Sequence, residues 1–211
     1  MSTYLFDFDG TLVNSMPVFC KMLTTILDDH GISYGEDMVK IVTPMGYIGA
    51  AEYFVNTLGL QMTQEEVLDW FHEYAVEAYS HTVEAKAHVI ETLRALKARG
   101  DDLNVLTASE HLTLDPCLKR LGVYDLFTNV WSCYDFDMFK SDPKIYHVVA
   151  ERLGKPIDQI IFIDDNYNAD CVAKSAGMQV WGIYDDSSAD FVEEMKAATD
   201  RYIYDFAELL D

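Results

Sequence analysis

The chain has 211 residues, half of them hydrophobic, and a formal net charge of −21 from 15 basic and 36 acidic side chains. This length suits one domain, or one domain with a smaller inserted one, and the composition argues against disorder. So strong a negative charge repels nucleic acid and anionic lipid, and no apolar run nears the roughly 20 residues that cross a bilayer. We therefore expect no nucleic-acid partner and no membrane partner.

The cysteines and the first residues predict a cytoplasmic protein. Four cysteines lack the Cys-x-x-Cys spacing of metal or redox sites and are typical of reduced, packed thiols. The N-terminus shows no basic region followed by an apolar stretch and a cleavage site, so no signal peptide is expected. The six histidines are scattered without a His-x-x-x-His pair, which argues against a zinc site.

The N-terminal part of the chain predicts one strand and then a run of helices. Residues 4–6 form an apolar and aromatic run typical of a buried strand. Helical spacing of apolar residues follows over about 16–31, 38–42, 48–58 and 63–79, with Ser15 as a plausible cap and a capping box at Thr63–Glu66. We read the aromatic stripes of these helices as core, and we expect residues 16–80 to form an all-helical bundle.

From about residue 84 onward, strand and helix patterns alternate. Strands are expected at 103–107, 127–131, 160–163, 180–183 and 202–204, and helices at 87–98, 111–121, 143–153, 169–176 and 189–197. This alternation predicts an α/β fold with a doubly wound parallel sheet. Residues 1–15 and 81–211 would form that domain, with residues 16–80 inserted into it.

The first strand is followed by two acids, Asp7 and Asp9, and then by Gly10, which breaks the strand pattern. Two carboxylates in one turn repel each other, and a divalent cation that prefers oxygen ligands removes that cost. On the Asp-x-Asp pattern alone, a solvated acidic turn is an equally good interpretation.

Other polar residues follow the later predicted strands, where ligands of parallel sheets bind. Thr107 follows the second strand, Lys140 lies beyond the third, and Asp164 and Asp165 end the fourth. A lone Thr at a strand end usually bonds locally, and a lone Lys is usually solvated. Adjacent acids at the end of a buried strand, however, are costly unless a cation joins them.

In this order the four sites resemble the motifs of the haloacid dehalogenase (HAD) superfamily. The first motif is similar to Asp7-Phe8-Asp9-Gly10-Thr11-Leu12, and the third to Lys140-Ser141-Asp142-Pro143-Lys144-Ile145-Tyr146. The second corresponds to Thr107, and the fourth to Phe162-Ile163-Asp164-Asp165 with the later Gly177-Met178. The chain most resembles the cap-bearing phosphatases, the phosphoglycolate phosphatase and beta-phosphoglucomutase-like group. It departs from their pattern at Asn14, Ser141 and Ala169.

The resemblance implies a role for each catalytic candidate. Asp7 would be the nucleophile, Asp9 the general acid and base, and Thr107 a hydrogen-bond donor to the phosphoryl group. Lys140 would neutralise charge on that group and on the nucleophile, with Lys144 as the less favoured choice of lysine.

The resemblance also implies a Mg²⁺ site. Its ligands would be Asp7, the main-chain carbonyl of Asp9 and Asp165, with Asp164 beside them. Relatives carry a further Asp or Asn where this chain has Ala169, so support from Asn168 or Asp170 stays open.

The function that follows is an Mg²⁺-dependent phosphatase with a Rossmann-like core and a helical cap. It would hydrolyse a small phosphorylated metabolite through an aspartyl-phosphate intermediate. The alternatives are a phosphomutase of the same superfamily, a haloacid dehalogenase, a non-catalytic phospho-receiver-like module and a catalytically silent relative that acts as a binding partner. Sugar phosphates, phosphoglycolate, nucleotides and pyrophosphate all stay open as substrates, as does the oligomeric state.

Overall fold

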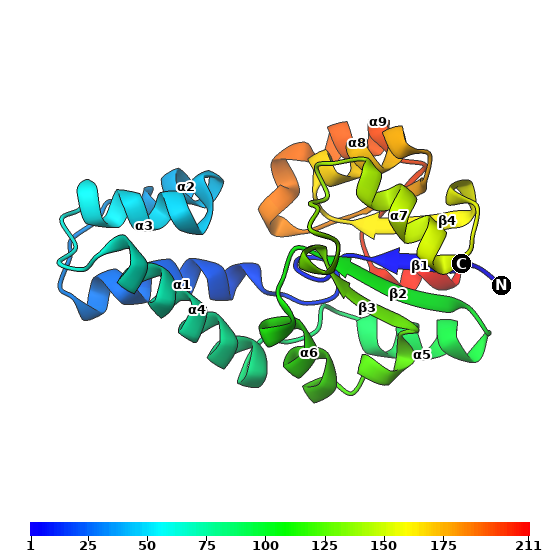
Figure 1. The fold of residues 1–211 in the computed structure, drawn as a ribbon, viewed down its shortest axis with the longest axis horizontal. Coiled ribbons are helices and arrows are strands. Elements are labelled where there is room, and N and C mark those ends of the chain that lie inside the picture. The colour runs from blue at the N-terminus through cyan, green and yellow to red at the C-terminus, as the bar shows by residue number, and fades with distance from the viewer. The chain divides into compact units, whose positions relative to one another are not determined.

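The computed structural model describes residues 1–211, apart from the side chain of Pro44. It contains two compact units: residues 1–14 with 83–211, here called the core unit, and residues 15–82, here called the helical insertion (Figure 1). The domain boundaries expected from the sequence lie between residues 15 and 16 and between residues 80 and 81, and they remain predictions. Each unit has its own hydrophobic core.

The core unit is built on a parallel sheet. Its strands are β1 (Thr3–Phe6), β2 (Asp102–Thr107), β3 (Asn129–Ser132), β4 (Ile160–Asp164), β5 (Gln179–Ile183) and β6 (Arg201–Ile203). They are arranged in the order β3-β2-β1-β4-β5-β6, and every pairing is parallel. The chain first adds β2 and β3 on one side of β1 and then adds β4 on the other side. The order therefore reverses between β1 and β4, and in such sheets ligands bind beyond the strand ends at that point.

Helices cover both faces of this sheet, which confirms the doubly wound fold. They are α5 (Val89–Ala98), α6 (His111–Arg120), α7 (Lys144–Leu153), α8 (Tyr167–Ala176) and α9 (Val192–Ala198). Short 3₁₀ turns lie at η2 (Tyr124–Leu126), η3 (Cys133–Phe136), η4 (Ile157–Gln159), η5 (Asp186–Phe191) and η6 (Phe206–Leu210). Figure 1 shows α5 and α6 on one face and α7, α8 and α9 on the other. On the second face Leu5, Phe162 and Val180 of the sheet pack with Ile145 and Val149 of α7.

The helical insertion contains α1 (Met16–Asp29), α2 (Met38–Val42), η1 (Thr43–Met45), α3 (Gly46–Asn56) and α4 (Gln64–His81). Its core includes Leu23 and Ile26 of α1, Phe54 of α3 and Phe71 of α4. Along each of α1, α3 and α4 the buried residues recur at helical spacing, so each of these helices turns one apolar stripe inward. Among the described residues, no helix in either unit combines the length and apolar character needed to cross a bilayer.

Several element ends lie away from their predicted positions. α5 begins at Val89 instead of residue 87, because His88 adopts a left-handed conformation with φ 60°. α8 begins two residues early, at Tyr167, because the Asn166 side chain accepts hydrogen bonds from the two main-chain N–H groups that follow Tyr167. The predicted 189–197 helix divides into η5 and α9.

Two further predictions at element ends were wrong. The third strand begins at Asn129 instead of residue 127, because η2 runs up to Leu126 and its closing turn includes Phe127. Ser15 precedes α1 but makes no side-chain capping bond within the described chain, because its backbone is already helical (φ −92°, ψ −22°).

Candidate active site

The turn after β1 carries the first two acids. Asp7 N donates to Ile163 O at 2.9 Å, so the pairing of β1 with β4 continues to the first acid. Gly10 then takes a φ of +75°, a backbone conformation that residues with a Cβ rarely adopt. The N–H groups of Leu12 and Val13 both donate to Phe8 O, which closes the turn.

Three buried carboxylates meet where β1 and β4 end. Asp7 follows β1, Asp164 ends β4 and Asp165 comes next. Each offers one carboxylate oxygen, and these oxygens all lie within 4.8 Å of one another. Asp7 is 157 or more positions away from the other two acids in the sequence, and the adjacency of β1 and β4 in the sheet brings them together.

Lys140 reaches this cluster from the segment between η3 and α7. Its Nζ donates to Asp7 Oδ1 at 2.5 Å and to Asp164 Oδ2 at 2.7 Å. The hydroxyl of Tyr146 donates to Lys140 O at 3.1 Å and so steadies the backbone that carries the lysine. Lys144, by contrast, is exposed at the start of α7.

Burial and crowding of charge shift the ionisation of these groups. Burial raises the pKa of Asp7 to about 7, with the charges of Asp164 and Asp9 adding to it against the attraction of Lys140. Burial and the charge of Asp164 also hold the pKa of Asp165 well above its usual range. Burial opposes the charge of Lys140, but the two carboxylates outweigh it and raise the pKa of the ammonium.

The remaining two catalytic candidates meet at Ser109. Ser109 Oγ donates to Asp9 Oδ2 at 2.5 Å, and Ser109 N donates to Thr107 Oγ1 at 3.0 Å. Thr107 ends β2, the neighbour of β1, so the same edge of the sheet carries both candidates. The Thr107 hydroxyl accepts in this contact, and a hydroxyl that accepts can still donate its proton to a ligand.

Sequence reasoning missed two contacts that hold the acids. Thr11 Oγ1 donates to Asp165 Oδ1 at 3.0 Å, and a Cβ on Gly10 would lie 2.4 Å from Asp165 Oδ2. The turn is therefore packed directly on Asp165, and only glycine fits at position 10. Ser109, which holds Asp9, lies two residues after Thr107. Neither Thr11 nor Ser109 has a sequence signal that identifies its partner.

The two residues considered as further support for a metal differ in position. Asn168 is exposed on α8. Asp170 is fully buried, and neither of its carboxylate oxygens has a hydrogen-bond partner among the described residues. Burial and the charges of Asp164 and Asp165 hold the pKa of Asp170 well above its usual range.

The chemistry of the cluster fits a divalent cation. Asp7, Asp164 and Asp165 place three buried carboxylates around one point, and among their described contacts a single lysine neutralises two of them. Hard divalent cations prefer such oxygen ligands, and an added positive charge would offset the repulsion that raises the pKa values of Asp7 and Asp165.

The fold and the order of the site residues identify the class of protein. The model of the haloacid dehalogenase-like hydrolase family matches residues 1–177. The chain therefore belongs to the haloacid dehalogenase-like hydrolases.

Several proteins that are similar to this chain in sequence are named for an enzymatic activity. It is 27% identical to a pyrophosphatase, PpaX of Bacillus velezensis, over 87% of this chain and 83% of the relative. It is 25% identical to a phosphoglycolate phosphatase of Haemophilus influenzae over 84% of this chain and 83% of the relative. It is 24% identical to an (S)-2-haloacid dehalogenase of Pseudomonas fluorescens over 97% and 93%.

A solved structure of a candidate beta-phosphoglucomutase from Thermotoga maritima has the same fold. The two superpose with a TM-score of 0.84 over 100% of this chain and 97% of the other, at 21% identity. At 21% sequence identity, this structural similarity supports the fold and not a shared activity.

Proposed function

We propose that this protein is an Mg²⁺-dependent phosphatase that hydrolyses a small phosphorylated metabolite through an aspartyl-phosphate on Asp7. The observation that supports this most is the contact of Lys140 Nζ with both Asp7 and Asp164 beside Asp165. Phosphoryl transfer needs positioning and neutralisation of charge more than covalent assistance, and this cluster offers both.

In the first proposed step, Asp7 attacks phosphorus and the bond to the departing alcohol oxygen breaks. Asp9 gives that oxygen its proton. Lys140 offsets the negative charge that Asp7 and the phosphoryl group bring together, and Thr107 donates a hydrogen bond to a phosphoryl oxygen.

In the second step, water attacks the phosphorus of the aspartyl-phosphate. Asp9, now a carboxylate, takes the proton from that water, and the bond between phosphorus and the Asp7 oxygen breaks. The products are inorganic phosphate and the regenerated Asp7 carboxylate. Ser109 keeps Asp9 in place through its hydroxyl.

The metal ion would be held by Asp7, Asp165 and the main-chain carbonyl of Asp9, with Asp164 adjacent. It supplies positive charge that lets an anionic phosphate approach anionic Asp7. A chain of net charge −21 otherwise repels a phosphate ester, so this local charge is a requirement of the proposed function.

We also propose that residues 1–15 and 81–211 act as the catalytic core and residues 16–80 as the cap. The helical insertion contains Lys21 and Lys40 but no Arg. A second phosphate group on the substrate would find only these two cations there, which favours hydrolysis of a monophosphate with a weakly charged leaving group over a phosphomutase reaction.

The test is a screen of phosphorylated metabolites with Mg²⁺, in which released phosphate is measured for the wild type and Asp7→Asn. We expect the variant to lose turnover by roughly three orders of magnitude or more, because it lacks the nucleophile. We also expect acid-quenched wild type to carry a hydroxylamine-labile phosphoryl group that the variant lacks. Full turnover in Asp7→Asn contradicts the proposal.

The same preparation distinguishes the alternatives. A phosphomutase would isomerise a sugar phosphate when primed with the bisphosphate, and a dehalogenase would release halide from a 2-haloacid without Mg²⁺. A receiver-like module would stay phosphorylated and release no alcohol. Asp9 and the acidic cluster argue against the dehalogenase, whose chemistry needs neither a second acid nor a metal.

A further inference from the structure

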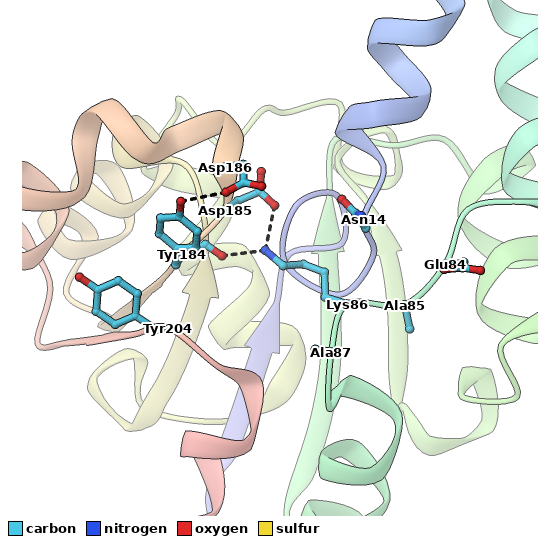
Figure 2. Close-up of a pocket in the computed structure, with 9 residues that line it drawn as sticks. All are labelled: Asn14, Glu84, Ala85, Lys86, Ala87, Tyr184, Asp185, Asp186 and Tyr204. Atoms are coloured by element: carbon cyan, nitrogen blue, oxygen red, sulfur yellow. Dashed lines mark hydrogen bonds and ion pairs between the residues drawn. The ribbon is translucent and has the colours of Figure 1, made fainter.

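Lys86 makes a set of contacts that the proposed catalytic steps do not use. Its Nζ donates to Gly10 O at 2.5 Å, to Tyr184 O at 2.7 Å and to Asp185 Oδ2 at 2.8 Å. An ammonium has three N–H donors, so each finds an acceptor. The Lys86 side chain is only 19% exposed, and Figure 2 shows it directed toward Tyr184 and Asp185 along the wall of a pocket of about 260 Å³.

The three acceptors flank the strand that carries the acidic pair. Gly10 lies in the turn after β1, and Tyr184 and Asp185 follow β5 directly. In the sheet β4 lies between β1 and β5. Lys86 therefore connects the two neighbours of β4 across the end from which Asp165 projects.

The contact with Gly10 is the one that reaches the active site. Gly10 is packed on Asp165, since a Cβ at position 10 would meet that carboxylate at 2.4 Å. Thr11, the next residue, donates to the same carboxylate, and Asp9 precedes Gly10. A displacement of the Gly10 peptide would therefore move Asp9 and Asp165 relative to each other.

The charge of Lys86 is matched by its own partner. Burial opposes ionisation of Asp185, but hydrogen bonds from Lys86 and Ser187 more than offset it and hold the pKa of Asp185 below its usual value. Lys86 thus forms a local ion pair, whereas Lys140 contacts the acids of the cluster.

We propose that Lys86 is a positioning residue, a brace between the β1 turn and the end of β5 that sets the spacing of Asp9 and Asp165. The consequence for Mg²⁺ and phosphate rests on the proposed function. The rigidity of the turn after β1 does not depend on the proposed function, and a separate experiment measures it.

Rigidity is tested by hydrogen–deuterium exchange of the metal-free full chain over the peptide that spans residues 8–15. We expect Lys86→Met to speed exchange of the turn amides by about tenfold, because hydrogen bonds to a charged donor are lost. Lys174→Met is the matched control, because Lys174 forms an exposed ion pair with Asp200 in the same unit. It should leave exchange of this peptide unchanged.

Positioning is tested by calorimetric titration with Mg²⁺. We expect Lys86→Met to weaken Mg²⁺ binding by about tenfold, as is typical when a group that orients ligands is lost, and Lys86→Arg to recover part of it, because a guanidinium also donates to several oxygens. Asp185→Asn, which removes the charged acceptor, should weaken binding less. If Lys86→Met does not fold, Asp185→Asn is used for the same measurement of Mg²⁺ binding.

The outcomes separate this proposal from the proposed function. Wild-type exchange and wild-type Mg²⁺ affinity in Lys86→Met overturn the brace, and so does an equal effect of Lys174→Met. Absence of phosphate release by the wild type overturns the proposed function and leaves the exchange result standing. If Asp7→Asn loses turnover while Lys86→Met behaves as wild type, only the brace is wrong.

Discussion

At the scale of single residues, two lysines of the core unit differ by what their ammonium groups contact. Lys140 donates to Asp7 and Asp164, two acids of the cluster, so its charge acts at the proposed reaction centre. Lys86 donates to two main-chain carbonyls and to Asp185, which balances its charge. The same residue type therefore supports different roles.

We expect Lys140→Met to lower kcat/KM by about 10²–10³, the range found when a group that stabilises transition-state charge is removed. Lys144→Met is the control, because Lys144 is exposed four residues further on. It should stay within about twofold of the wild type. Steady-state kinetics on folded variants, checked by circular dichroism, decide this, and equal losses in the two variants would contradict the role of Lys140.

Asp170 is a buried acid whose carboxylate has no partner among the described residues, and its pKa is raised well above the ordinary 3.8. The folded protein therefore keeps a proton that the unfolded chain loses once the pH passes about 4. Stability conferred by the protonated form declines as the pH rises from there toward the folded pKa. The raised pKa of Asp170 therefore lowers the stability of the folded protein at neutral pH.

We expect Asp170→Asn to raise the free energy of unfolding at pH 7 by roughly 1–3 kcal/mol. The gain should shrink as the pH falls toward 4, because the unfolded-state carboxyl, whose ordinary pKa is 3.8, then begins to take up a proton as well. Urea unfolding in EDTA at pH 4 to 7 measures this. Asp190→Asn, at an exposed position, is the control and should show no such trend. If Asp170→Asn raised the free energy of unfolding equally at every pH, the raised pKa of Asp170 would not be its cause.

At the scale of elements, the starts of α4 and α5 differ in whether a local sequence signal marks them. α4 begins with a complete capping box, in which Glu66 N donates to Thr63 Oγ1 at 3.2 Å and Thr63 N donates to Glu66 Oε2 at 2.7 Å. This box was predicted from the sequence because the whole motif lies within four residues. The start of α5 was not, because the left-handed backbone of His88 lacks a local signal.

We expect Thr63→Ala to lower the stability of the helical insertion by about 1 kcal/mol, since it removes the acceptor for Glu66 N. Thr24→Ala is the matched control in the same unit. Thr24 Oγ1 donates to main-chain carbonyls of α1, at Cys20 and Lys21, an arrangement that adds little to a helix. Thermal unfolding followed by helix ellipticity should separate the two; a larger loss in Thr24→Ala would contradict the capping account.

At the scale of the whole molecule, a net charge of −21 makes the folded chain repel itself. We expect the Tm of the metal-free protein to rise by roughly 3 °C, equivalent to about 1 kcal/mol at this length, between 10 mM and 150 mM NaCl. The rise should level off above that concentration, because the screening length is then about 8 Å. A Tm that stays constant or falls over this range, measured calorimetrically in EDTA, would mean that ion pairs outweigh the repulsion.

The sequence by itself determined the order of the elements and the acids that follow β1 and β4. Strand, helix and capping signals act over a few neighbouring residues, and the site motifs are short strings, so both were predictable. Asp7, Thr107, Lys140 and Asp165 were named on that basis, although their catalytic roles stay predictions.

Only the tertiary structure decided which distant groups meet. The bond from Thr11 to Asp165 joins positions 154 apart, and those from Lys86 reach 76 residues back and up to 99 ahead. The burial of Asp170 without a partner likewise depends on how α8 packs under β5, where a Cβ on Gly182 would lie 3.3 Å from it. Such contacts follow from strand order and register, which depend on the packing of the whole sheet and leave no pattern among neighbouring residues.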